Sequence, residues 1–256
     1  MSLGSAGEPD PARVGHLAGL AERLQAPLVS EHVAFVRAGG LEAGHLLPVP
    51  RTRETLDVLA ANVRLAQAEL PVPLALEHVA ALLEWPAPEL DEAAFLTELL
   101  DRTGAWLLLD LANLYANARN HGGDPLAFLD ALPLERVAYV HVAGGVERDG
   151  LYHDTHAHPT PPAVLDLVAE LCARRDPPGV MLERDDDAGL RQCGRVGDAI
   201  ATAVQVGHEG HTAGVLLLRR VVQPLGVRKN HRASCRHSFH FKVGTTSALQ
   251  SLLSLR

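Results

Sequence analysis

The stretch VPLALEHVAALLEWPAPELDEAAFLTELLDRTGAWLLLD, residues 72–110, contains the repeating unit that decides the fold. A short apolar run ends at Glu77, a segment with apolar residues at helical spacing follows at 90–104, and a second apolar run ends at Asp110. Strand, helix and strand in this order are typical of parallel β/α proteins, in which the carboxyl ends of the strands meet on one face. The unit therefore predicts that Glu77 and Asp110 face a common pocket.

The same alternation extends along most of the first 187 residues. Further apolar runs end at His32, carry His141 and end at Glu183. Amphipathic or capped segments predict helices, and polar stretches rich in Gly, Pro, Asn or His predict long loops. The helices are expected at about 10–25, 52–70, 90–104, 125–131 and 162–174, and the loops at 34–50, 111–125 and 143–162.

Imidazole and carboxylate side chains gather at the ends of the predicted strands and just beyond them. Nitrogen and oxygen ligands without thiolates suit Fe(II), Mn or Zn. The set exceeds what one ion with about four to six ligands can use, so two or three ions that share bridging carboxylates are expected. A single residue of this kind is more often an ordinary loop residue, but five consecutive strands favour a metal site because isolated buried carboxylates are costly. The candidate ligands are His32, Glu77, Asp110, His141, Asp154, His156 and Glu183.

Other polar residues give weaker signals. Asn113 could add a carbonyl ligand, although Asn is also common in turns. His45, Asn117 and Arg184 are candidate substrate contacts. His78 follows Glu77 on the opposite face of its strand, and a packed histidine is the expected role for it.

Composition predicts a cytoplasmic protein. The 256 residues are 47% hydrophobic, enough for one substantial core, and the three cysteines fit neither a disulfide framework nor a C-x-x-C metal site. No signal peptide precedes the first helix, and no apolar run approaches the roughly 20 residues of a membrane helix. We therefore expect no membrane partner.

The carboxyl-terminal part has a different character. Residues 1–187 hold 29 acidic and 13 basic side chains, whereas residues 188–256 hold 2 and 10. A nucleic-acid partner is not expected, because no RNP, zinc-finger or helix-turn-helix signature accompanies the basic residues. Residues 1–205 are predicted to form the β/α domain and 206–256 a basic, poorly ordered tail, although a shifted reading frame past about residue 190 would produce a similar change.

Several motifs carry a resemblance to a known family, the DUF692 family. It is also called UPF0276, or the multinuclear non-haem iron-dependent oxidative enzymes, and the similarity spans about residues 2–187. The most specific element is D-x-x-N-x-Y-x-N-A, which begins at Asp110. The motifs are SEHVAF (30–35), GHLLPVP (44–50), LEHVA (76–80), LLLDLANLYANARNHG (107–122), YVHVAGG (139–145), HDTH (153–156) and MLERDDD (181–187).

The resemblance implies a TIM (β/α)8 barrel of the xylose-isomerase-like type that holds two or three iron ions. It also implies O₂-dependent oxidation of residues, often cysteine, in a ribosomally synthesised precursor peptide, commonly with a small companion protein that presents the substrate. Position by position, the seven candidate ligands and Asn113 match iron ligands. Glu77 is expected to bridge two ions, and Glu77 and Asp110 to serve catalysis.

The chain also departs from the family pattern. His78 stands where relatives usually have Asn, and Arg184 stands where many have Trp, which affects substrate choice more than metal binding. Two initial β/α units, with one further histidine ligand, have no counterpart before Met1. The barrel is therefore expected to be incomplete at its amino terminus.

Two alternatives remain open from the sequence. A divalent-metal isomerase or endonuclease of the xylose-isomerase-like type would use similar ligands with Zn or Mn. A non-catalytic fragment could bind a peptide or partner without turnover. Metal analysis would separate these alternatives from an iron-dependent oxidase.

Overall fold

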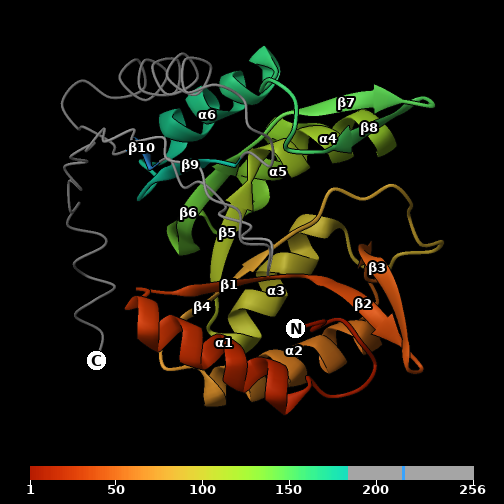
Figure 1. Cartoon of the computed structure of the whole chain (residues 1–256). Helices are drawn as coiled ribbons and strands as arrows, with labels where there is room; N and C mark the ends of the chain where they lie inside the picture. Colours follow the sequence, from red (N-terminus) through yellow and green to blue (C-terminus); the bar gives the residue numbers. More distant parts are fainter. Residues whose placement is uncertain (184–214, 217–256) are drawn as a thin grey trace, which may run out of the picture.

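A parallel β-sheet forms the centre of the computed structural model, which describes residues 1–183, Val215 and Leu216 (Figure 1). The strand order is β1-β4-β5-β6-β9-β10, and all neighbours are parallel. The predicted β/α alternation is thus confirmed, but a closed ring of strands is absent from this described part. The strands are β1 (Val29–His32), β4 (Leu74–Glu77), β5 (Trp106–Asp110), β6 (Val137–Val142), β9 (Val180–Leu182) and β10 (Val215–Leu216).

Helices connect and cover the strands. Four of the five predicted helices begin at a side-chain cap, since Asp10, Thr52, Asp91 and Asp124 each accept a hydrogen bond from a backbone N–H in the first turn. All five predicted helices are present within a few residues of their expected ends. They are α1 (Pro11–Leu24), α2 (Arg53–Glu69), α3 (Glu92–Thr103), α5 (Pro125–Ala131) and α6 (Pro162–Arg174), and a 3₁₀ turn spans Leu134–Arg136.

The predicted loop at 111–125 is mostly a helix, α4 (Leu111–His121), so that prediction was wrong. Asp110 caps α4, because its Oδ1 accepts the N–H groups of Ala112 and Asn113. The intrinsic tendency of Asn to favour turns is overcome because the side chains of Asn117 and Asn120 bond backbone groups of neighbouring segments.

The predicted loops at 34–50 and 143–162 contain β-hairpins, which were not predicted. Strands β2 (Ala34–Ala38) and β3 (Leu41–Pro48) pair antiparallel, as do β7 (Gly145–Arg148) and β8 (Leu151–Asp154). Two residues with positive φ connect each pair, Gly39-Gly40 in the first hairpin and Asp149-Gly150 in the second. Gly-Gly and Asp-Gly suit such two-residue turns, so the signal was present in the sequence.

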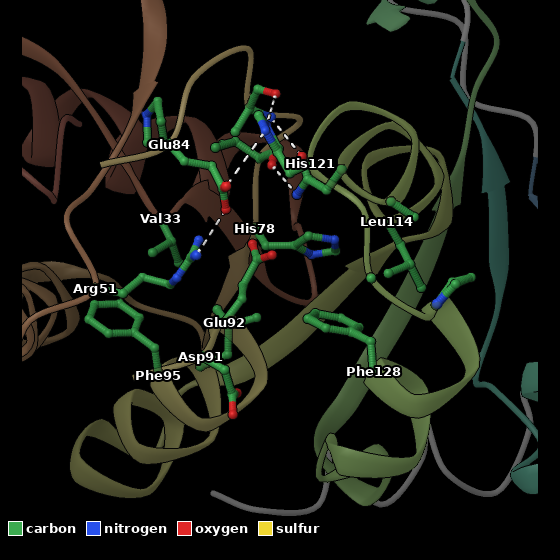
Figure 2. A pocket seen from close by; sticks show the side chains of 18 of the residues that line it. Val33, Arg51, His78, Glu84, Asp91, Glu92, Phe95, Leu114, His121 and Phe128 are labelled. Atoms are coloured by element: carbon green, nitrogen blue, oxygen red, sulfur yellow. Dashed lines mark hydrogen bonds and ion pairs between the residues drawn. The ribbon is translucent and has the colours of Figure 1, made fainter. Parts of the chain in front are cut away.

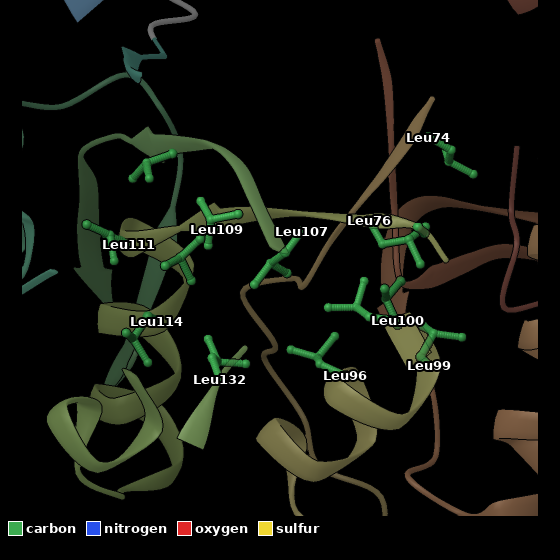
Figure 3. Close-up of a cluster of buried hydrophobic side chains, with 14 of the residues drawn as sticks. Leu74, Leu76, Leu96, Leu99, Leu100, Leu107, Leu109, Leu111, Leu114 and Leu132 are labelled. Carbon is green, nitrogen blue, oxygen red and sulfur yellow. The ribbon is translucent and has the colours of Figure 1, made fainter. Parts of the chain in front are cut away.

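The main core lies between the helices and one face of the sheet (Figure 3). Alternation along each strand sends one set of side chains to this core and the other set to the inner face. On β4, Leu74 and Leu76 belong to the main core, whereas Ala75 joins Leu108 and Ala138 in a separate small cluster. Glu77 follows Ala75 at a spacing of two and therefore lies on the inner face with that cluster.

The sheet is strongly curved. Strands β1 and β6 are separated by β4 and β5, which would place them about 14 Å apart in a flat sheet. The hydroxyl of Tyr139 on β6 nevertheless donates a hydrogen bond to Ser30 Oγ on β1 at 2.9 Å. This curvature brings the carboxyl ends of distant strands together over the inner face.

No helix in the described segments is both long and apolar enough to cross a lipid bilayer. The predicted tail begins at residue 206, and all of it except Val215 and Leu216 lies outside the described residues. These two residues pair with Val180 and Met181 of β9, at the edge of the sheet.

Candidate metal centre

Three adjacent strands place an imidazole and two carboxylates at one point. Glu77 ends β4, Asp110 ends β5, and His141 lies near the end of β6, opposite Asp110 in the strand register. One ligand atom from each of the three residues lies within 4.8 Å of the others. All three residues are buried, at 5%, 1% and 6% exposure respectively, so the group is poorly hydrated.

Two residues from the flanking strands extend this group on either side. His32, at the end of β1, places Nε2 3.4 Å from Glu77 Oε2. Glu183, directly after β9, places Oε2 3.2 Å from His141 Nδ1. The five strand-end residues that the sequence pattern identified are therefore brought together in space.

The second hairpin supplies the last two predicted ligands. Asp154 ends β8, and its Oδ2 lies 2.6 Å from His156 Nε2. The other ring nitrogen of His156, Nδ1, lies 3.6 Å from Glu183 Oε1. His156 has a φ of 54°, in the left-handed region, which is uncommon for residues other than Gly although His is enriched there together with Asn and Asp.

Several buried polar atoms of this cluster have no hydrogen-bond partner in the described part of the chain. They are Asp110 Oδ2, Asp154 Oδ1 and both ring nitrogens of His141. Buried polar groups are nearly always satisfied, so unsatisfied atoms in and beside the group of Glu77, Asp110 and His141 favour a bound ligand there. Imidazole nitrogens and carboxylate oxygens are the donor set of Fe, Mn or Zn, and the residues present therefore fit a metal ion.

The charges of the cluster shift its pKa values strongly. Burial alone would lower the pKa of His141, but the carboxylates of Glu183, Glu77 and Asp110 outweigh burial and raise it to about 10. Burial raises the pKa of Asp110 to about 8, and the charges of Glu77 and Asp154 act in the same direction. Without a metal, Asp110 and His141 thus keep their protons at neutral pH, and these protons reduce the repulsion among the carboxylates.

The pKa values of two further residues also reflect burial opposed by neighbouring charges. Burial opposes the charged form of His156, but Asp154 and Glu183 raise its pKa to about 9. Burial would raise the pKa of Glu77, yet His141 and His32 lower it. Perturbed groups that gather in one place are typical of functional sites.

The side chains of the weaker candidates Asn113 and Asn117 bond backbone groups near the end of β4. Asn113 is buried, and its Nδ2 donates to the backbone carbonyl of His78, which leaves its side-chain oxygen as the only atom for a metal. Asn117 uses its amide nitrogen on Val79 O and its amide oxygen on Ala81 N. His45 is exposed on β3, and Arg184 lies outside the described residues, so the substrate contacts stay predictions.

Two residues beneath the cluster were missed. Tyr139 lies two positions before His141 on the same face of β6, and the two rings make an edge-on contact with centroids 5.2 Å apart. Ser30 lies two positions before His32 and accepts the Tyr139 hydroxyl. The two-residue period of strands would have identified both as inner-face neighbours of the ligands.

Comparison with known proteins places the chain in a family. The profile described as "RiPP precursor modification enzyme MbnB/TglH/ChrH" matches residues 1–195. The chain belongs to this family. Its curated relatives carry the name UPF0276, and the resemblance found in the sequence motifs is thereby confirmed.

Three relatives show the extent of the match. A UPF0276 protein of Streptomyces avermitilis is 59% identical over 194 residues, which cover 73% of this chain and 40% of the relative. One of Caulobacter vibrioides is 40% identical over 187 residues, covering 73% and 67% respectively. One of Acaryochloris marina is 36% identical over 187 residues, covering 73% and 68%. The matched part of the chain thus spans two-fifths of the first relative and about two-thirds of the other two.

Proposed function

We propose that the cluster holds two or three iron ions and that the protein uses O₂ to oxidise a residue, often cysteine, of a ribosomally synthesised precursor peptide. The observation that carries this proposal is the row of alternating imidazoles and carboxylates across the curved sheet. In order, the row contains His32, Glu77, His141, Glu183 and His156, with Asp110 beside His141 and Asp154 beside His156.

Two carboxylates in this row each face two different imidazoles. Glu77 directs Oε2 to His32 and Oε1 to His141, at 3.4 and 3.5 Å. Glu183 directs Oε2 to His141 and Oε1 to His156, at 3.2 and 3.6 Å. A carboxylate whose two oxygens face different imidazoles could serve two ions, so Glu77 and Glu183 would be the residues shared between neighbouring ions.

The distances themselves fit shared ions. Two ligand atoms at about 2.1 Å from one ion lie about 3.0 to 3.4 Å apart in octahedral or tetrahedral geometry. The separations between His141 Nδ1 and the nearest oxygens of Glu183, Glu77 and Asp110 are 3.2, 3.5 and 3.7 Å. The first separation is at the upper limit of hydrogen-bond lengths and the other two exceed it, and all three need only small adjustments to surround a cation.

The family description points to peptide modification as the reaction class. Bound iron would supply the redox chemistry with O₂, as cofactors generally carry the difficult step. The protein's own residues would fix the ligand geometry, keep water out through the apolar inner layer and orient His141 through Tyr139. We also propose a precursor peptide as the substrate and a small companion protein that presents it. Both belong to the proposal because the chain covers only part of the length of its relatives.

Metal stoichiometry tests the proposal directly. The full chain is made anaerobically with Fe(II), and iron per chain is measured for the parent, Glu77→Ala and Asp154→Ala. We expect more than one iron in the parent, loss of more than one in Glu77→Ala, and loss of about one in Asp154→Ala, because a bridging ligand serves two ions. His16→Ala and Glu54→Ala, on exposed faces of α1 and α2, are matched controls and should retain the parent value.

Each result has a defined meaning. Equal partial losses in the two variants would contradict the bridging role of Glu77. Zinc or manganese in place of iron would favour a divalent-metal isomerase or endonuclease. A parent without stoichiometric metal would reject the metalloenzyme proposal and favour a binding protein without turnover.

A further inference from the structure

A second site-like feature lies on the helix side of the sheet, away from the metal ligands. It is a cavity of about 350 Å³ lined by residues of α3, α4 and α5 and of the segment that follows β4 (Figure 2). Its volume is within the range of ligand pockets, about 300 to 1,000 Å³. Apolar walls come from Val33, Val49, Phe95, Leu114 and Phe128.

His78 forms the polar part of this cavity. It succeeds Glu77 along the chain, and because side chains alternate across a strand it projects to the side opposite the metal ligands. Its ring is 2% exposed and lies 5.7 Å from the ring of Phe128. Neither ring nitrogen has a hydrogen-bond partner among the described residues.

The prediction that His78 is a packed histidine therefore explains only part of its environment. A buried donor or acceptor without a partner is unfavourable, and His78 presents one of each in the uncharged form. Arg51 adds a second unsatisfied donor, because its buried Nε has no partner whereas Nη2 pairs with Glu84 at 3.2 Å. Figure 2 shows His78 and Arg51 on the same cavity.

Charge and polarity together define the ligand. Four carboxylates line the cavity against a single guanidinium, namely Glu84, Asp91, Glu92 and Asp124 against Arg51. An anion would be repelled by this excess. A neutral amide, in contrast, offers one carbonyl acceptor for the N–H groups and one N–H donor for the acceptor nitrogen of His78.

We propose that this cavity binds a neutral, largely apolar molecule that carries an amide group, at a site separate from the metal centre. The amide contacts His78 and Arg51, and the apolar body lies against Phe95, Leu114 and Phe128. The ligand satisfies the buried polar atoms that the chain itself leaves unpaired. This proposal does not depend on the identity or presence of the metal.

N-acetyl-L-leucine amide is a suitable probe, and N-acetyl-L-leucine is its anionic counterpart. Titration calorimetry with the metal-free full chain should give saturable binding of the amide, and at least about tenfold weaker binding of the anion. In two-bond proton–nitrogen spectra of the histidine rings, the amide should shift the His78 signals, which are assigned by their loss in His78→Leu.

Two variants and one control define the location. His78→Leu removes the polar contacts, and Ala118→Leu fills the cavity from α4 without altering β4. Both should weaken amide binding about tenfold or more. Ala94→Leu adds the same bulk to an exposed position of α3 outside the lining and should bind as the parent does.

Three results would overturn the proposal. Absence of saturable amide binding would indicate that water alone fills the cavity. Unchanged binding in Ala118→Leu would place the ligand elsewhere, even where His78→Leu fails to fold. Tighter binding of the anion than of the amide would refute the assigned ligand class.

Discussion

One carboxylate oxygen of Asp110 accepts the backbone N–H of Asn113 at 2.8 Å, while the other lies 3.7 Å from His141 Nδ1 in the metal centre. The same side chain thus caps helix α4 with one oxygen and contributes the other oxygen to the site. The position of α4, which carries Asn117 and Asn120, therefore depends on a candidate metal ligand.

Substitution of Asp110 should separate its two contributions. Asp110→Asn keeps an oxygen that can cap α4, since Asn and Asp cap equally well, but it removes the negative charge that a cation requires. We expect Asp110→Asn to lose metal with little loss of helix. Asp110→Ala should lose metal and also about 1 kcal/mol more in the free energy of unfolding.

Metal content and denaturant unfolding of the metal-free proteins provide the measurement. The exposed cap Asp10 of α1 is a control position, where Asp10→Ala should reduce stability and leave metal content unchanged. If Asp110→Asn retained the parent metal content, Asp110 would be a structural cap only.

The stability of the metal-free protein should fall as pH rises. Asp110, His141 and His156 have folded-state pKa values of about 8, 10 and 9, all above their ordinary values. The folded state therefore binds more protons than the unfolded state, and the free energy of unfolding decreases with pH. The histidine contribution is complete below about pH 6.5 and is lost through pH 9 to 10, while the Asp110 contribution is lost between about pH 4 and 8.

Thermal unfolding at fixed ionic strength between pH 6 and 9.5 checks this expectation. Each bound proton that differs between the two states contributes at most about 1.4 kcal/mol per pH unit. Bound metal should flatten the profile, because it replaces the protons on the same ligands. A metal-free protein that gained stability over this interval would show that the sign of these shifts is wrong.

The Tyr139–Ser30 hydrogen bond should contribute to sheet curvature and stability. Tyr139→Phe and Ser30→Ala each remove the bond between β6 and β1, and each should reduce the free energy of unfolding by about 0.5 to 1.5 kcal/mol. In a double-mutant cycle the second change should cost less than it does alone. Additive effects would mean that the two groups contribute independently rather than through their mutual bond.

Asn120 should support the hairpin that carries Asp154. Its side chain pairs with the backbone of Tyr152 on β8, where Oδ1 accepts the N–H at 2.7 Å and Nδ2 donates to the carbonyl at 2.9 Å. Asn120→Ala should destabilise the protein by about 1 to 3 kcal/mol, because it leaves buried or partly buried backbone groups without a partner.

The same change should reduce metal occupancy selectively. In the proposed multinuclear site, only an ion held by Asp154 and His156 would depend on this hairpin, so we expect loss of about one ion per chain. The adjacent Arg119→Ala is a control, because the contact it removes between α4 and the same hairpin is an exposed ion pair with Glu147 of β7, which contributes little. Full metal content in Asn120→Ala would show that the hairpin keeps its position without this contact.

Much of the architecture followed from local patterns. Apolar runs that end on His, Asp or Glu predicted five strands of the sheet, and helical spacing together with caps such as Asp91 and Asp124 predicted five of the helices. These features are local, because hydrophobic period and capping depend on residues within a few positions of one another.

The two hairpins and α4 were harder to predict. The hairpins lie in polar stretches, and their Gly-Gly and Asp-Gly turn signals are short. Helix α4 lies in an Asn-rich stretch and depends on partners distant in the sequence. Asn120 and Asn117 remain in a helix because they bond segments 32 and 36 positions away along the chain. Propensity is a weak prior when tertiary contacts of this kind are available.

By itself, the sequence determined which residues could serve as ligands, since strand period and parallel order place His32, Glu77, Asp110, His141 and Glu183 at the same end of the sheet. Only the tertiary structure decided their pairing. Sheet curvature, seen in the contact of Tyr139 with Ser30, brings the outer strands within reach, so that Glu77 and Glu183 each lie between two imidazoles. Curvature arises from the packing of all strands and helices together, and no local stretch of sequence encodes it.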